Sequence, residues 1–173
     1  MSKLQIYCVT DREIPFLEES DYKLAAVGKK KFSDKYLKCD FKDNIFHKEE
    51  NYSELTFHYW FWKNQLQYKN NEDWIGFCQK RRFWIKETVN SNIKKENIND
   101  YLITEPLSDW SKYEAIICKS IKVSGAKKSK ILKRGWRNII RDPSILFLKK
   151  KENISLHFDM HHGYGNLEKA INE

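Results

Sequence analysis

The feature that most constrains this chain is the alternation of short apolar runs with longer stretches of helical periodicity. Three runs rich in apolar, β-branched and aromatic residues occupy residues 3–10, 25–28 and 74–78. Each is followed by polar or turn-forming residues, a pattern typical of buried strands. Strands that alternate with helices predict an α/β fold, with a mostly parallel central sheet flanked by helices.

A dense aromatic stretch separates the second run from the third. Two sets of residues recur there at helical spacing: Leu55, Tyr59, Trp62 and Leu66, and the pair Trp60 and Asn64. We therefore expect a helix over 52–68, ended by the Asn70-Asn71 pair. Residues two apart point to different sides of a helix. Either Trp60 or Trp62 is then partly exposed beside a pocket, unless all the large aromatic side chains belong to the core.

The later segments give weaker signals. We expect short strands at 100–106 and 153–158, a helix over 127–141 that ends before Asp142-Pro143, and the start of another helix at 167–171. The length of 173 residues fits a single domain spanning 1–173. No apolar run is long enough to predict a membrane-spanning helix. Residues 1–3 lead directly into the first apolar run without a secretory leader, which predicts a cytoplasmic protein.

The four cysteines fit the same compartment. Cys8, Cys39, Cys78 and Cys118 are widely spaced and form no CxxC pair, the spacing that a cysteine zinc site normally shows. We interpret all four as reduced core residues in a reducing cytosol.

The positive charge is concentrated in one segment. The chain has a formal net charge of +8, and residues 119–151 contain twelve basic residues and one acid, Asp142. This segment therefore carries +11, and the rest of the chain carries −3. Within it the apolar residues of 127–141 fall on one helical face. A basic amphipathic helix of this kind binds an anionic membrane surface or nucleic-acid phosphates, or it is a solvated face over the core.

Polar residues at two predicted strand ends are candidates for ligand binding. Thr10 and Asp11 follow the first strand, where ligands bind in open α/β sheets, so they are placed to bind a ribose or a base. Arg81 and Arg82 follow the third strand, and the planar guanidinium matches a diphosphate. An ordinary turn and a solvated arginine pair are the alternatives.

Two further groups of residues carry possible chemistry. On the aromatic helix, Glu54 and Lys63 are suited to bind a sugar hydroxyl and a phosphate. Near the end of the chain, His157, Asp159 and His161 alternate onto one face if the segment is extended, where they could bind a divalent metal. The alternative for this segment is a structural turn that leads into 163–165.

Several sequence blocks, taken together, resemble one family. The blocks are IYCVT at 6–10, AVG at 26–28, DNI at 43–45, NYSELTFHYWFWKN at 51–64 and IGFCQKRRF at 75–83. Their order and spacing are similar to those of the DUF4422 family, glycosyltransferase-like proteins of capsular and O-antigen polysaccharide gene clusters. The resemblance covers about 4–84 well and 157–171 more loosely, whereas 86–150 carries little of it.

The resemblance implies a GT-A-like (Rossmann-like) fold that transfers a hexose from a nucleoside-diphosphate sugar, UDP-hexose above all, to a growing glycan. By this resemblance Glu54 and Asp159 are the candidate catalytic residues. A Mn²⁺ or Mg²⁺ ion would bind Asp159, His157 and His161. The donor would contact Thr10, Asp11, Gly28, Lys63, Asn64, Arg81 and Arg82. The basic segment would then hold the protein on the inner face of the membrane, beside a lipid-linked acceptor.

The sequence also departs from the family's blocks. Asp11 stands where the family has His after the first strand, and 79–82 reads QKRR where the family has His-Tyr-Arg-Arg. Family domains continue past the His-rich block, so the resemblance implies a fold shortened at its C-terminus. The departures leave two alternative functions open: a non-catalytic domain that binds sugar nucleotides, or a basic protein that binds nucleic acid.

Overall fold

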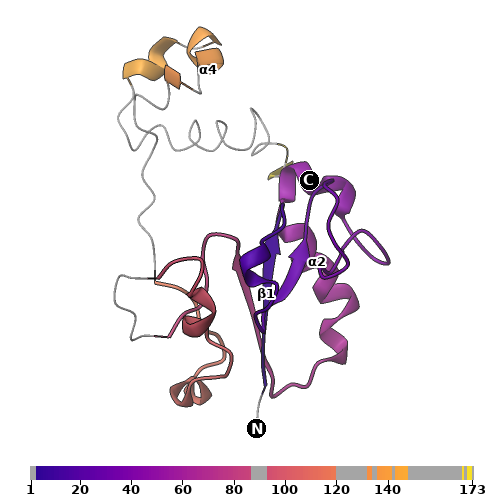
Figure 1. The fold of residues 1–173 in the computed structure, drawn as a ribbon. Helices are drawn as coiled ribbons and strands as arrows, with labels where there is room; N and C mark the ends of the chain where they lie inside the picture. The colour runs from indigo at the N-terminus through magenta and orange to yellow at the C-terminus, as the bar shows by residue number, and fades with distance from the viewer. Residues whose placement is uncertain are drawn as a thin grey trace. The chain divides into compact units, whose positions relative to one another are not determined.

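The computed structural model describes residues 3–86, 93–119, 132–133, 136–141, 143–147, 169 and 171–172. Contacts divide the chain, for which we expected one domain, into two compact units, 1–116 and 117–173. The boundary falls close to the start of the basic segment at 119. Figure 1 shows the elements of both units, and the sheet belongs to the first.

The first unit is built on a parallel sheet of three strands, β1 (Leu4–Thr10), β2 (Lys23–Ala26) and β3 (Trp74–Gln79). The strand order is β2-β1-β3, and β1 pairs in parallel with both neighbours. In this register Cys8 lies opposite Leu24 on one side and Cys78 on the other. The predicted α/β class is therefore confirmed, and the all-parallel open sheet is consistent with a Rossmann-like fold.

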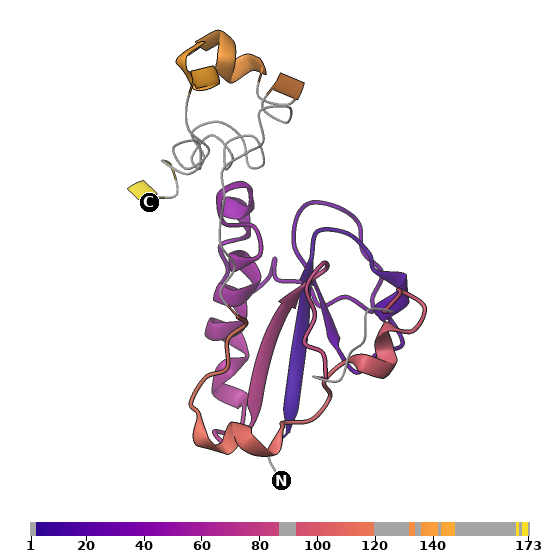
Figure 2. The ribbon, with the colours of Figure 1, turned by 90° about the vertical axis from the view of Figure 1, so that its left-hand side faces the viewer.

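The two connections between the strands cover opposite faces of the sheet. Alternate residues of β1 point to opposite sides. Ile6 and Cys8 pack with Leu17 from the 3-10 helix η1 (Pro15–Leu17), which lies between β1 and β2. Tyr7 and Val9 pack on the other face, against the helix that precedes β3. Figure 2 shows that helix, α2 (Leu55–Asn64), running alongside the strands.

The predicted helix over 52–68 is present but broken. It consists of α1 (Glu49–Tyr52), α2 (Leu55–Asn64) and the 3-10 helix η3 (Leu66–Tyr68), preceded by η2 (Phe46–Lys48). The break falls at Ser53, whose φ of 46° lies outside the helical region. A residue whose backbone has a positive φ cannot continue a right-handed helix.

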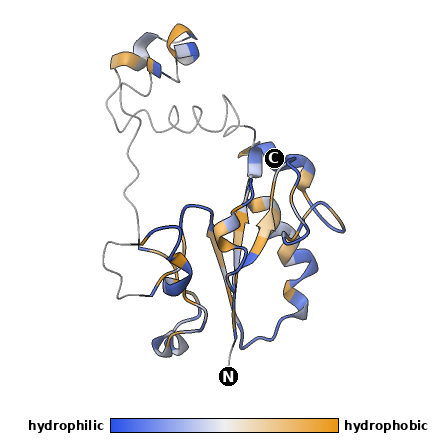
Figure 3. Cartoon of the chain, viewed as in Figure 1, coloured by the Kyte–Doolittle hydropathy of each residue, from blue (hydrophilic) through white to orange (hydrophobic). Residues whose placement is uncertain are grey.

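The sheet covers only one of the two helical stripes of α2. Trp60, with Phe57, Phe61 and Asn64, faces the sheet, and the Trp60 indole donates a hydrogen bond to the Phe41 carbonyl at 3.0 Å. Trp60 is 0% exposed, whereas Trp62 is 56% exposed. The two tryptophans therefore face different surroundings, as their spacing predicts. Figure 3 shows that the strands of the sheet are drawn largely in the colour of hydrophobic residues, in keeping with the buried core on both faces of β1.

The predicted strand at 100–106 is wrong. The chain forms the 3-10 helix η4 (Ile98–Tyr101) there, followed by an isolated bridge between Ile85 and Leu102. Leu102 and Ile103 are buried like strand residues, but only a short antiparallel contact pairs their backbone. Apolar burial alone therefore does not make a strand. The 3-10 helix η5 (Ser108–Lys112) follows.

The prediction that all four cysteines belong to the core holds for three of them. Cys8, Cys39 and Cys78 are buried and free, but Cys118 is exposed and does not belong to the core.

In the second unit, 132–133 is helical and α4 (Trp136–Arg141) ends before residue 142, as predicted, with the 3-10 helix η6 (Pro143–Phe147) after it. The predicted strand at 153–158 lies outside the described residues. Residues 169, 171 and 172, at the predicted last helix, are helical.

No helix in the described part of the chain combines the length and the apolar character needed to cross a bilayer.

The orientation of α2 predicts unequal effects of two tryptophan substitutions. Trp60→Ala removes a fully buried ring and its hydrogen bond, and we expect it to lower the free energy of unfolding by about 3–5 kcal/mol. Trp62→Ala removes an exposed ring and should cost about 1 kcal/mol or less. Urea denaturation of the full chain, followed by circular dichroism, measures both. Equal losses would mean that α2 presents a different face to the sheet.

Candidate functional site at the carboxyl edge of the sheet

The carboxyl ends of the three strands form the edge where the predicted ligand-binding residues gather. The strand order places β2 on one side of β1 and β3 on the other, and their connections cross opposite faces. Open α/β sheets bind ligands beyond the carboxyl ends of the strands at which the connections reverse in this way, here β1 and β3. Asp11 lies directly after Thr10, the last residue of β1, and Lys80 directly after Gln79, the last residue of β3.

The turn after β1 is held by Thr10. Its buried hydroxyl donates a hydrogen bond to the Arg12 carbonyl at 2.6 Å and accepts one from the Arg12 N–H at 3.2 Å. These two bonds satisfy the Thr10 side chain within the protein. Its contribution to a site is therefore the shape of the turn, which presents Asp11 at the edge.

Asp11 forms an ion pair with Lys80, and Lys80 Nζ donates a hydrogen bond to Asp11 Oδ1. Arg12 approaches the same oxygen at 3.4 Å. Burial by itself would raise the pKa of Asp11, but the hydrogen bonds and positive charges of Lys80 and Arg12 lower it to about 2. Asp11 is therefore ionised throughout the physiological pH range.

Lys80 is a site residue that the sequence analysis missed. The signal in the sequence was its position directly after the third predicted strand. The parallel register, in which Val9 pairs with Gln79, then brings the residues after β1 and β3 close together.

A group of carboxylates lies on the other side of β1. Gly28, after β2, has a φ of +86°, a conformation that favours glycine, and a Cβ placed there would lie 3.5 Å from Glu49 Oε1. Burial raises the pKa of Glu49, and the negative charges of Glu50, Asp11 and Glu54 raise it further, while Lys29 opposes them. Glu49 was not predicted as a site residue.

Glu54 precedes the first turn of α2, with His58 one turn further along. The Glu54 carbonyl accepts hydrogen bonds from the N–H groups of Phe57 and His58, at 3.1 and 3.4 Å. The His58 ring stacks on Phe77 of β3, with ring centroids 4.4 Å apart. Burial lowers the pKa of His58, although the Glu54 charge acts in the opposite direction. A neutral imidazole therefore stands close to the charge of Glu54.

Basic side chains lie at both outer strands of this edge. Past the end of β2 lies a cavity of about 370 Å³, whose charged lining residues are three lysines and one acid: Lys30, Lys31, Lys38 and Asp40. Past the end of β3, residues 79–82 form a tight turn, in which the Arg82 N–H donates to the Gln79 carbonyl at 2.9 Å. Arg81 and Arg82 are exposed on this turn.

Two predicted donor residues lie elsewhere. Lys63 and Asn64 end α2, about 15 Å along the helix from Glu54. The buried Asn64 amide donates to the carbonyls of Asp43 and Trp60, at 2.7 and 2.8 Å. Lys63 Nζ lies 4.0 Å from the centre of the Trp62 ring. The structure thus brings Thr10, Asp11, Gly28, Glu54, Arg81 and Arg82 to one edge, but not Lys63 and Asn64.

The predicted metal ligands His157, Asp159 and His161 lie outside the described residues, so this site stays a prediction. Over the described ranges, no group of three or more His, Cys, Asp and Glu side chains is placed to hold a metal ion.

Comparison with known families identifies the chain as a member of the DUF4422 family, which is described as a domain of unknown function. The match covers residues 5–143. It includes the stretch from 86 onward, where the sequence blocks gave little resemblance, and it ends before the His-rich segment. Comparisons with curated proteins and with solved structures found no match.

The ion pair predicts how Asp11 titrates. We expect its carboxyl carbon, followed by NMR, to titrate near pH 2 in the native chain, and Lys80→Gln to move the midpoint toward the ordinary value of about 3.9. Because the pKa is lower in the folded state, the pair stabilises the fold above about pH 3.9 and loses this effect as the pH falls through about 2. Solvent exposure limits that contribution to about 1 kcal/mol.

Lys35→Gln is the matched control, because Lys35 pairs with Glu18 and Glu19 instead of Asp11. If the titration midpoint of Asp11 is unchanged in Lys80→Gln, Asp11 and Lys80 do not form the ion pair.

Proposed function

We propose that the carboxyl edge binds a nucleoside-diphosphate sugar, UDP-hexose above all, and transfers its hexose to a growing glycan of the capsular or O-antigen type. The observation that carries this proposal is the placement of basic groups on both sides of β1. Lys30, Lys31 and Lys38 lie past β2, and Lys80, Arg81 and Arg82 past β3. Adjacent strands are about 4.8 Å apart, so the outer strands are separated by about 10 Å, a span suited to a nucleoside diphosphate.

The chemistry of transfer assigns roles to the groups at this edge. The acceptor hydroxyl oxygen forms a bond to the anomeric carbon, the bond from that carbon to the diphosphate oxygen breaks, and the acceptor proton passes to a carboxylate. Arg81 and Arg82 are suited to stabilise the departing diphosphate through bidentate hydrogen bonds. Lys80 can add its charge there when it leaves Asp11.

Two carboxylates at the edge are candidates for the general base. Glu54, the predicted one, lies beside His58, and Glu49 lies beside Gly28. A raised pKa makes a carboxylate a stronger base, which favours Glu49. Asp159 stays the other predicted catalytic residue. With His157 and His161 it offers the oxygen and nitrogen ligands that suit Mn²⁺, which would add positive charge beside the leaving group.

We further propose that the second unit binds the anionic inner face of the membrane, where lipid-linked acceptors reside. In α4, Trp136 is 52% and Ile140 70% exposed, and Phe147 of η6 is 86% exposed. Arg137 lies 5.5 Å from the centre of the Trp136 ring, and Lys133 is close in sequence. Exposed apolar side chains beside basic ones suit insertion at a lipid surface, whereas binding to nucleic-acid phosphates requires only the basic ones.

Nucleotide-sugar binding tests the first proposal. Calorimetry with UDP-glucose, UDP-galactose, GDP-mannose and UDP, each with and without Mn²⁺, should reveal one donor that binds the full chain. We expect Arg81→Ala/Arg82→Ala to weaken that binding by at least about tenfold, because two charge-assisted contacts to phosphate are lost.

The matched control is Lys3→Ala/Lys23→Ala, which removes two exposed cations at the opposite, amino edge of the sheet. If both double variants weaken binding equally, the effect comes from the net charge of the chain and not from contacts of Arg81 and Arg82 with phosphate. Binding without release of UDP in the presence of acceptor would favour the non-catalytic alternative, and failure to bind any of these nucleotides would exclude the proposal.

Vesicle co-sedimentation tests the second proposal. The full chain should sediment with vesicles of mixed phosphatidylcholine and phosphatidylglycerol but not with pure phosphatidylcholine. Trp136→Ala should lower the partition coefficient several-fold through lost apolar contact, and Arg137→Gln by about fivefold through lost attraction. Trp62→Ala, which removes a tryptophan of similar exposure from the first unit, is the control. Sedimentation that is insensitive to Trp136→Ala would contradict insertion of this helix.

A further inference from the structure

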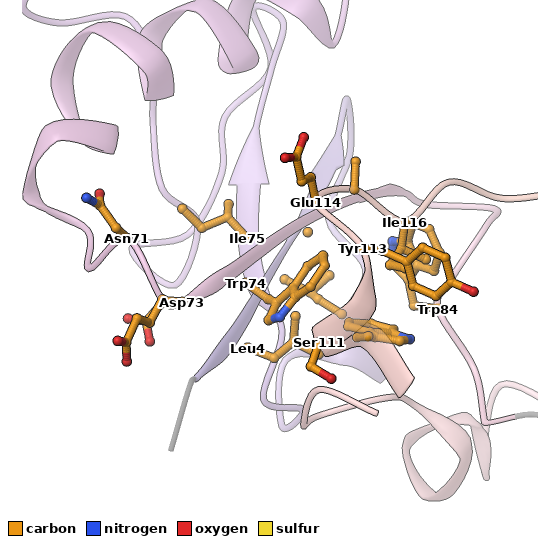
Figure 4. Close-up of a pocket in the computed structure, with 15 residues that line it drawn as sticks. Leu4, Asn71, Asp73, Trp74, Ile75, Trp84, Ser111, Tyr113, Glu114 and Ile116 are labelled. Atoms are coloured by element: carbon orange, nitrogen blue, oxygen red, sulfur yellow. The ribbon is translucent and has the colours of Figure 1, made fainter. Parts of the chain in front are cut away.

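A larger cavity, of about 760 Å³, lies away from the carboxyl edge, at the first half of β3. Its floor is formed by Leu4 and Ile6 of β1 with Trp74 and Gly76 of β3, and residues 110–111 and 113–116 line another side. Gly76 packs closely here, since a Cβ at this position would lie 2.9 Å from Ile6 Cγ1. Figure 4 shows Trp74 near the centre, with Trp84 and Tyr113 toward one end and Asn71 and Asp73 toward the other.

Four aromatic side chains line this cavity. Trp74 and Trp110 pack edge to face, with ring centroids 5.2 Å apart. The Trp84 indole is held by a hydrogen bond from its N–H to the Phe77 carbonyl at 2.9 Å. Tyr113, by contrast, is 56% exposed. The cavity therefore combines ring faces held in place by the fold with one accessible ring.

The charged side chains of the cavity are all acidic. Glu72, Asp73 and Glu114 line it, and no lysine, arginine or histidine is among the fifteen residues around it. Asp73 Oδ1 accepts the Lys3 backbone N–H at 2.9 Å, which fixes that carboxylate. Phosphates and nucleotides are repelled by such a surface, even though the whole chain carries a net charge of +8. The ligand that fits is neutral or cationic.

We propose that this cavity binds a neutral oligosaccharide. The C–H face of a sugar ring stacks on an indole or phenol ring, whose face is electron-rich, while sugar hydroxyls donate hydrogen bonds to carboxylates and to the Asn71 amide oxygen. A compact cation also favours rings and carboxylates. A cavity of about 760 Å³ is much larger than such an ion and matches a chain of several rings.

The position of the cavity suggests how the oligosaccharide is used, and this step rests on the proposed function. Gly76 lies three residues before Gln79, the last residue of β3, which corresponds to about 10 Å along the strand. A glycan bound by its inner sugars along the first half of β3 could extend its growing end toward the carboxyl edge. The cavity would then select the acceptor, while the edge binds the donor.

Binding of glycans in the absence of nucleotide tests the proposal. An array of neutral oligosaccharides built from hexoses and N-acetylhexosamines is probed with the full chain, and the strongest ligand is then titrated by calorimetry. We expect Tyr113→Ala and Glu114→Gln each to weaken binding by about tenfold, because each removes one contact to the sugar. Tyr68→Ala removes a tyrosine that is 74% exposed outside the cavity and should leave binding unchanged.

The outcomes separate this inference from the donor site. Arg81→Ala/Arg82→Ala should retain oligosaccharide binding, and Tyr113→Ala should retain donor binding. An array without any bound neutral glycan, or binding that Tyr113→Ala and Tyr68→Ala weaken equally, overturns the proposal. If choline binds the cavity and no glycan displaces it, the ligand of the cavity is a cation instead of a sugar.

Discussion

The rest of the first unit depends on the parallel pairing of β1 with a strand on each side. Because both neighbours run in the same direction as β1, each must be reached by a crossover, and the two crossovers cover opposite faces of the sheet. This buries both faces of β1 and gathers all three carboxyl ends at one edge. The same pairing thus creates both the core and the edge that carries the candidate site.

Charge is distributed along this frame with opposite signs at two places. The carboxyl edge combines basic residues past β2 and β3 with the Asp11–Lys80 pair between them. The cavity at the first half of β3 contains carboxylates and aromatic rings. An anionic donor would be attracted to the basic residues at one end of the strand, whereas a neutral acceptor would be bound at the other end by aromatic rings and hydrogen-bonding groups. The proposed transfer then requires the growing end of the acceptor to reach the donor at the carboxyl edge.

The sequence predicted the elements better than it predicted their contacts. The three apolar runs coincide with strands because burial on both faces of the sheet favours short apolar segments there, although β2 covers Lys23–Ala26 instead of 25–28. At 100–106 the same kind of signal failed, since η4 and a single bridge bury Leu102 without a strand partner. In α2, periodicity identified two stripes, and only packing against the sheet decided that Trp60, and not Trp62, is buried.

By itself the sequence determined the α/β class, the family and the residues that end β1 and β3, because these depend on local patterns and on blocks of neighbouring residues. The tertiary structure decided that Lys80 faces Asp11, that Glu49 lies beside Gly28 and that Lys63 and Asn64 stand at the far end of α2. It also brought 110–116 against β3 to form a cavity. Each of these contacts joins residues distant along the chain, which only the packing of the core brings together.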